Sequence, residues 1–438
     1  MNISEIDNKF IGKIRTGWEI RTLKTVCSYI SDGSHFSPKI VDSGYPYITV
    51  GNVYDNEIHL ENAMHISLED FELLKRNGCQ PQKGDVLLAK DGTVGRTAIV
   101  HDEDVVVLSS LGIIRPLEHL KPRFLKYVLD AEILQEQMKA DMAGSALKRI
   151  TIKKISNLRV VVAPIEEQDI IADYLDEKCG DIDSQVALLE KKRDAYARLK
   201  VSVINKAVTH GLNPDVSMRP SGIDWIGDIP AHWERLRLKD VSYMYSGLTG
   251  KSGDDFRCDD DTKTKPFVPF TNVLNNTKID FNQFNRVVMA EGEQQNRVLE
   301  NDIIFLMSSE DYESIAKSAV VVGDPGEVYL NSFCRGLHFT SNDIFAPFVN
   351  YQLNSEKYHD ALRFEARGFT RINIKVDRVF SQFITVPPLA EQREIADYLD
   401  KKCGEIDAVV ENLDKQIDAY KRLKKSLINE VVTGKRAV

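Results

Sequence analysis

The residues best suited to chemistry in this 438-residue sequence are basic and hydroxyl side chains that stand beside glycines in polar turns. Three such turns are Lys90-Asp-Gly-Thr-Val-Gly-Arg96, Gly144-Ser-Ala-Leu-Lys-Arg149 and Arg367-Gly-Phe-Thr-Arg371. Arg and Lys bond to phosphates or guanine edges, and glycine lets backbone N–H groups come close to a ligand. Any single one of these loops is equally well explained as an ordinary solvated turn. Taken together, they predict a surface that contacts DNA, with these candidate residues: Lys90, Thr93, Arg96, Ser145, Lys148, Arg149, Lys251, Ser308, Arg367, Thr370 and Arg371.

Motifs for catalysis are missing from the sequence. Asn213-Pro-Asp-Val216 lacks the second proline and the aromatic residue of a DNA methyltransferase tetrad. Gly247-Leu-Thr-Gly-Lys-Ser252 is like a phosphate-binding loop, but Tyr245 stands where that loop requires its first glycine. HExxH, GxSxG and clustered carboxylates are also missing. We therefore expect a non-catalytic protein that binds no metal and no cofactor directly.

The composition is that of a globular protein, with 42% hydrophobic and 28% charged residues. The net charge of −9 is unusual for a DNA binder, but the segment from Lys139 to Arg159 carries six basic residues against Asp141 alone. Six cysteines are scattered without metal-ligand spacing, which favours buried thiols. No apolar run approaches the length of a membrane span, and the first residues do not resemble a secretory signal, so we expect a cytoplasmic protein.

The chain contains a tandem duplication. The segment 164–209 aligns without a gap on 388–433, with 28 of 46 positions identical. A second ungapped match joins the stretch from Ile11 to the stretch from Ile226. Between these anchors the two copies diverge. The pattern predicts two domains of one fold that present different side chains, as two different targets would require.

Each repeated segment is predicted to form a long helix that begins just after a proline, at Pro164 and at Pro388. Apolar residues recur every seven positions, which is typical of a helix that pairs with another helix. We expect the two helices to pair antiparallel as a pseudo-twofold coiled coil, although each could instead pack on its own domain. The candidate pairing residues are Leu175, Ile182, Leu189, Tyr196, Leu399, Ile406, Leu413 and Tyr420.

The regions between the anchors contain short β-rich runs and one helical stretch each, which favours an α+β fold. The sequence therefore predicts four parts: a first globular domain, a central helix that acts as a spacer, a linker with a second globular domain, and a C-terminal helix. Their expected ranges are 1–163, 164–211, 212–387 and 388–438.

This order of parts resembles the specificity subunit of type I restriction-modification systems over almost the whole chain. The residues that carry the resemblance are Ile226-Gly-Asp-Ile-Pro-Ala-His-Trp233, Gly84-Asp-Val86, Asp91-Gly-Thr-Val-Gly95 and Pro388-Leu-Ala-Glu-Gln392. The resemblance implies two target recognition domains, each of which reads one half of a split DNA site, and paired helices that set the unread spacer. It also implies partners: methyltransferase subunits that bind S-adenosylmethionine, and restriction subunits that use ATP and Mg²⁺.

Three other functions remain open at this point. The chain could be the DNA-reading subunit of a type IIB-like system, or a scaffold in which a coiled coil spaces protein-binding domains. The missing catalytic motifs argue more strongly against a nuclease or methyltransferase remnant. Because the loops of the two copies differ, we expect a bipartite and asymmetric DNA target.

Overall fold

The computed structural model describes residues 11, 14–54, 56–101, 104–142, 149–257 and 263–438. Contacts between residues divide the chain into two compact units. Unit 1 comprises residues 1–191 and 414–438, and unit 2 comprises residues 192–413. Both boundaries fall inside long helices, so unit 1 takes part of its structure from the C-terminal end of the chain. The four-part division made along the sequence remains a prediction.

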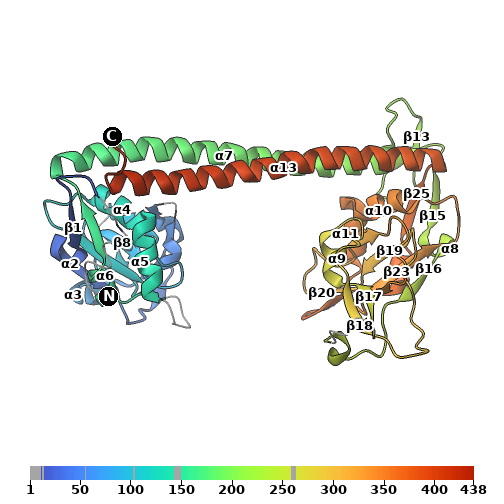
Figure 1. Ribbon diagram of the computed structural model, residues 1–438, viewed down its shortest axis with the longest axis horizontal. Helices are drawn as coiled ribbons and strands as arrows, with labels where there is room; N and C mark the ends of the chain where they lie inside the picture. The colour runs from blue at the N-terminus through green and yellow to red at the C-terminus, as the bar shows by residue number, and fades with distance from the viewer. Residues whose placement is uncertain (1–10, 12–13, 55, 102–103, 143–148, 258–262) are drawn as a thin grey trace. The chain divides into compact units, whose positions relative to one another are not determined.

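Unit 1 is built on an antiparallel sheet in the order β2-β11-β8-β9, of which Figure 1 labels β8. All four residues of β8 are buried. Val86 and Leu88 face one hydrophobic cluster, and Leu87 and Ala89 face another. Successive side chains of a strand point to opposite faces, so a strand covered on both faces must be apolar throughout. The strands of this sheet are β2 (Cys27–Asp32), β8 (Val86–Ala89), β9 (Thr97–Ile99) and β11 (Leu111–Pro116).

Unit 2 repeats this sheet with other residues, in the order β16-β23-β19-β21. Its central strand β19 is also fully buried, with Ile303 and Phe305 on one face and Ile304 and Leu306 on the other. The two units therefore share a scaffold whose core strands read as unbroken apolar runs. The strands are β16 (Ser242–Ser246), β19 (Ile303–Leu306), β21 (Ser318–Val320) and β23 (Cys334–Phe339).

A second, smaller sheet accompanies the first in each unit, in the orders β10-β4-β7-β3 and β18-β17-β22. One two-stranded ladder in each unit, β1-β12 or β15-β25, joins the start of the globular part to the strand before the long helix. In unit 1 the strands are β1 (Glu19–Thr22), β3 (Ile40–Val41), β4 (Tyr45–Ile48), β5 (Val53–Tyr54), β6 (Glu57–Ile58), β7 (Met64–Ile66), β10 (Val106–Val107) and β12 (Arg159–Val162). In unit 2 they are β13 (Met218–Pro220), β14 (Asp228–Pro230), β15 (Glu234–Arg237), β17 (Thr264–Val268), β18 (Asn285–Val288), β20 (Ser308–Ser309), β22 (Tyr329–Leu330), β24 (Ile372–Asn373) and β25 (Phe383–Val386).

Short helices cover the sheets. In each unit one of them, α4 or α10, lies between the main sheet and the long helices (Figure 1). Proline is the first residue of α4 and the second of α10, positions where its missing N–H costs no hydrogen bond. The short helices are α2 (Leu23–Val26), α3 (Leu68–Arg76), α4 (Pro122–Asp130), α5 (Glu132–Met142), α6 (Ile152–Ser156), α8 (Leu238–Val241), α9 (Phe270–Asn275), α10 (Ala346–Asn354), α11 (Glu356–Phe364) and α12 (Val376–Phe380).

Two long helices are present where the sequence predicts them: α7 (Ile165–His210) and α13 (Leu389–Val432). Each begins directly after its proline. Gly211 ends α7 with a φ of 72°, and Gly434 follows α13 with a φ of 69°. Left-handed backbone of this kind is accessible to glycine at little cost, which explains why both helices stop there.

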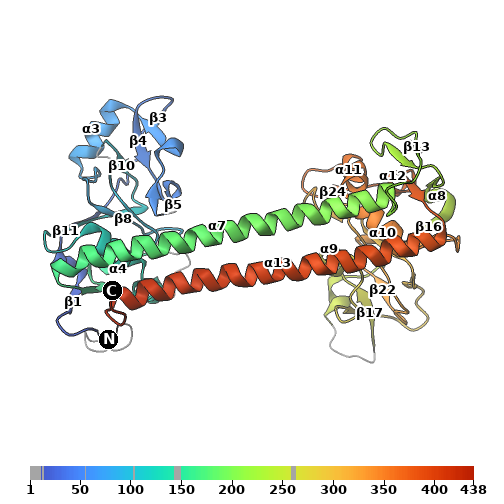
Figure 2. The same cartoon turned by 90° about the horizontal axis from the view of Figure 1, so that it is seen from above.

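Within each unit the two long helices run antiparallel, side by side (Figure 2). In unit 1, Leu175, Cys179 and Ile182 of α7 share a core with residues near the end of α13, namely Leu427, Ile428, Val431 and Val432. In unit 2, Ala207 and Val208 from the end of α7 share a core with Ile395, Ala396 and Leu399 of α13. The C-terminal end of each helix is therefore buried in the globular core of the other copy. The predicted α+β class with two long antiparallel helices and an internal repeat is confirmed.

Candidate nucleic-acid interface

Lys90 follows strand β8 in unit 1, and its side chain is almost completely buried. Its Nζ lies 3.4 Å from Oδ2 of Asp32 and 3.9 Å from Oδ2 of Asp91. A buried ammonium requires such carboxylate partners, because desolvation without them is costly. In this structure Lys90 therefore ties the loop to strand β2, and its contact with DNA remains a prediction.

Thr93 and Arg96 are exposed on the turn that joins β8 to β9. The turn reverses through Gly92 and Gly95, whose φ values are 68° and 99°. Gly95 is packed so closely that an added Cβ would lie 2.1 Å from Oε1 of Gln135. The exposed side chains are therefore held on a tightly anchored turn, which suits a surface that positions contacts to a ligand.

Arg149 is half-exposed and joins the same turn from another segment, because its Nε lies 2.9 Å from Oδ1 of Asp91. The backbones of Asp91 and Arg149 also form an antiparallel bridge. Ser145 and Lys148, two further predicted residues, lie outside the described residues. In unit 1 the structure thus brings together Lys90, Thr93, Arg96 and Arg149 around one turn.

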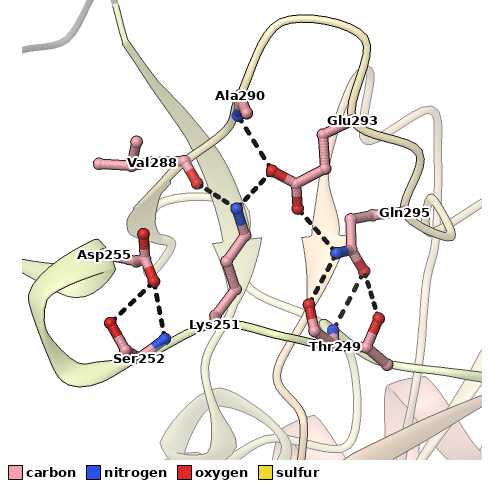
Figure 3. A network of polar contacts seen from close by, with 8 residues as sticks. All are labelled: Thr249, Lys251, Ser252, Asp255, Val288, Ala290, Glu293 and Gln295. Atoms are coloured by element: carbon pink, nitrogen blue, oxygen red, sulfur yellow. Dashed lines mark hydrogen bonds and ion pairs between the residues drawn. The ribbon is translucent and has the colours of Figure 1, made fainter.

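Lys251 in unit 2 is bound into a polar network of its own domain (Figure 3). Its Nζ donates to the carbonyl oxygen of Val288 at 2.7 Å and contacts Oε2 of Glu293 at 2.5 Å. The hydrogen bond from Lys251 is the largest cause that lowers the pKa of Glu293 to about 2, and the backbone N–H of Ala290 adds to it. Gln295 links the same carboxylate to Thr249. The ammonium joins two loops, so a direct role of Lys251 in DNA contact remains a prediction.

The remaining predicted residues of unit 2 lie together around one loop. Arg367, Thr370 and Arg371 are exposed on it, and Ser308 of β20 pairs with Asn373 at its end. The guanidinium carbon of Arg371 lies 4.6 Å from the centroid of the Phe333 ring. Sequence reasoning missed Phe333, which is 38 positions away along the chain, and it also gave no role to the exposed Phe369. The sequence did contain a signal for Phe369, because an apolar ring between two arginines in a polar turn indicates a candidate contact residue.

The predicted helix-pairing residues lie on the inner faces of α7 and α13. Tyr196 and Tyr420 are half-buried, and the others are buried: Leu175, Ile182, Leu189, Leu399, Ile406 and Leu413. Each unit adds an ion pair between the helices at equivalent positions. Lys424 contacts Asp183 at 2.6 Å in unit 1, and Lys200 contacts Asp407 at 2.6 Å in unit 2. The exchange of equivalent partners is what a pseudo-twofold repeat predicts.

Each copy of the helix also anchors the loop before a short helix through a buried glutamine. Gln168 accepts a hydrogen bond from the backbone N–H of Lys121 and donates to the carbonyl oxygens of His119 and Ala163. Gln392 makes the equivalent bonds in unit 2, to Phe345, Asp343 and Pro387. The glutamine of the Pro-x-x-Glu-Gln motif therefore has a structural role, because three backbone groups would otherwise be buried without partners.

Within the described part of the chain, no group of three His, Cys, Asp or Glu side chains is arranged to hold a metal ion. The helices in the same part of the chain include none that is long and apolar enough to cross a membrane. Five described cysteines are buried free thiols, and burial raises the pKa of Cys27 to about 12.

The repeated α+β scaffold and the two long helices define a protein built from two copies of one unit, which present different polar loops. A family model described as the type I restriction modification DNA specificity domain matches residues 15–194 and 230–418. The chain belongs to this family, and it serves as a DNA specificity subunit of a type I restriction-modification system.

Individual relatives agree with this family. The type I restriction enzyme MjaVIII specificity subunit of Methanocaldococcus jannaschii is 23% identical over 97% of this chain and 94% of its own length. A chain from a solved type I R-M system has a TM-score of 0.70 at 15% identity and covers 97% of this chain and 100% of its own. The HsdS subunit from Thermoanaerobacter tengcongensis has a TM-score of 0.50 at 16% identity, with 97% and 98% covered. These structures show the shared fold.

Proposed function

We propose that each unit reads one half of a bipartite, asymmetric DNA site, and that the paired helices set the spacer and dock methyltransferase subunits. The observation that carries this proposal is a difference between equivalent loops. The same pair of core strands is joined by residues 90–96 in unit 1 and by residues 307–317 in unit 2. The first loop carries two basic residues and one acid, and the second carries three acids and one basic residue. One scaffold with two surfaces suits two different half-sites.

The chain itself acts as a non-catalytic adaptor in this proposal. S-adenosylmethionine would be bound by the methyltransferase subunits, and ATP and Mg²⁺ by the restriction subunits. The cytoplasm is the compartment in which such a complex would meet its DNA. A type IIB-like complex would use the same DNA-reading units, whereas the family match favours DNA recognition over a scaffold that only spaces proteins.

The DNA target can be determined by methylome sequencing of cells that carry the chain with its methyltransferase subunits. We expect adenine methylation at a split motif whose two halves differ. A continuous or palindromic motif would contradict the proposal. Replacement of residues Trp233–Val386 by the equivalent domain of a relative should change one half of the motif only, and the spacer and the other half serve as internal controls.

Docking can be tested at two equivalent exposed positions of the helices. Leu199 of α7 and Leu423 of α13 are 47% and 50% exposed and occupy equivalent positions of the two helices. We expect Leu199→Asp and Leu423→Asp each to weaken the binding of methyltransferase subunits, and the double variant to abolish it. The exposed Lys192→Ala on α7 is the matched control. Normal assembly of the double variant, measured by size exclusion with light scattering, would exclude this docking face.

A further inference from the structure

We infer that Phe369 is a base-contacting residue of unit 2, which meets the bases of its half-site while Arg367 and Arg371 on either side meet the phosphates. This inference rests on the proposed function and names a residue that determines specificity within it. These three residues lie on the loop from Arg367 to Asn373, the clamp loop.

The clamp loop is closed by its own backbone. The N–H of Arg367 donates to the carbonyl oxygen of Asn373, and the N–H of Asn373 donates to the carbonyl oxygen of Arg367, both at 2.9 Å. Nδ2 of Asn373 also donates to the carbonyl oxygen of Arg371 at 3.1 Å. Gly368 has a φ of 151°, and an added Cβ would lie 1.9 Å from the carbonyl oxygen of Arg371. The loop is therefore preorganised and requires glycine at this position.

Phe369 lies at the exposed part of this closed loop. Its relative exposure is 102%, so the ring makes no shielding contact with its own domain. A ring fully exposed at the tip of a rigid loop is well placed to insert into a partner's surface. Other aromatic side chains of the same unit are also exposed, among them Tyr312, Phe333 and Phe364. One of them, Phe333, packs against the guanidinium of Arg371 and limits its freedom.

The charges around the ring favour a polyanion. Among the described residues, neither Arg367 nor Arg371 has a carboxylate within ion-pair distance. Arg367 uses one nitrogen, Nη1, to bond the carbonyl oxygens of Phe364 and Ala366, which fixes its position and leaves its other donors available.

Two nearby acids are already engaged. Asp311 accepts hydrogen bonds from the N–H and the hydroxyl of Ser314, and these bonds lower the pKa of its carboxyl. Glu313 contacts Arg363 at 2.7 Å. Neither acid forms an ion pair with the two arginines of the clamp loop.

Duplex DNA fits this combination better than a protein surface does. Its phosphates attract the two arginines, and an aromatic side chain between such cations can contact base edges or wedge against a base step.

The test uses the full chain assembled with its methyltransferase subunits, at one fixed salt concentration. The probes are a duplex that carries the site found by methylome sequencing and a duplex in which the unit 2 half-site is scrambled. Phe369→Ala and Phe369→Ser should weaken binding to the first probe by about 5- to 100-fold and leave binding to the second unchanged. Phe369→Trp should retain most of the affinity. Arg371→Gln should weaken binding to both probes by a similar factor, since phosphates carry no sequence information.

Tyr243→Ser is the matched control, because it removes another exposed ring of unit 2, on strand β16 outside the clamp loop, and should leave the affinity for both probes unchanged. If Phe369→Ala assembles and folds normally yet binds the site as tightly as the parent chain, the inference is wrong and the proposed function stands. Loss of complex assembly in Phe369→Ala would also overturn it and assign the ring to a protein partner. If the parent complex itself does not distinguish the two probes, the proposed function fails.

Discussion

Units 1 and 2 have different polar side chains at equivalent positions beneath their main sheets. Below the main sheet of unit 1, the buried Lys126 contacts Asp130 at 2.7 Å, and Thr97 donates to the same carboxylate. The equivalent residues of unit 2 are Asn350 and Asn354, which bond to Ser318 and to each other. A buried polar position thus tolerates an ion pair or an amide pair, provided that every group has a partner. The comparison shows that the scaffold fixes where polarity is allowed and leaves open which residues supply it.

The largest effect should come from breaking the ion pair of unit 1. Lys126→Met leaves Asp130 as a largely buried carboxylate, 16% exposed, without its cation, which should cost about 3 kcal/mol of stability. Hydrogen exchange measured by mass spectrometry should show the loss in unit 1 peptides, with unit 2 as the internal control. The double variant Lys126→Asn with Asp130→Asn installs the pair of unit 2 and should recover most of the loss. If it does not, the two arrangements are not interchangeable.

A second pair of equivalent positions offers a smaller effect. Asp85 of unit 1 binds Arg115 through two hydrogen bonds of 2.8 Å, and Asp302 of unit 2 instead binds Tyr245 and His338. Arg115→His copies the residue of unit 2 into unit 1. We expect a cost of about 1–3 kcal/mol, because a shorter side chain cannot keep both bonds to the buried carboxylate. Urea unfolding checks the value, and His338→Arg is the reciprocal variant. If Arg115→His leaves the stability unchanged, the two parallel hydrogen bonds from the guanidinium to Asp85 are unimportant for the fold.

The Lys251–Glu293 pair of unit 2 should contribute less to stability, and its contribution should depend on pH. The pKa of Glu293 is lowered to about 2 from its ordinary value of 4.5. A carboxyl with a depressed pKa stabilises the fold above its unfolded pKa, and this contribution is lost as the pH falls toward the folded value. Lys251→Met should therefore lower the melting temperature at pH 6, by an amount equivalent to about 1–2 kcal/mol. The difference from the parent chain should shrink as the pH falls from 4.5 toward 2.

The outcome of this last measurement would also separate two roles for Lys251. Lys265 provides the matched control, since its ion pair with Glu327 is more exposed and should matter less. A melting difference that is independent of pH would contradict the assignment of the effect to Glu293. Unchanged stability together with weaker DNA binding would instead support the direct DNA contact that the sequence predicted.

The sequence by itself determined the duplication, the two long helices and the family. Helix boundaries are local: a proline at the start and a glycine at the end act within one turn, and the heptad pattern marks the buried face before any partner is known. The apolar runs of β8 and β19 likewise predicted strands. These features need no knowledge of distant residues, which explains why they could be read directly.

Only the tertiary structure decided what the individual polar residues do. Lys90 and Lys251 are basic residues in glycine-containing turns, as are Arg367 and Arg371, yet the first two are buried against carboxylates and the last two are exposed. The tertiary structure also decided that the end of each long helix enters the core of the other copy. The physical reason is that the environment of a charge depends on groups far away in the chain, which no local pattern contains.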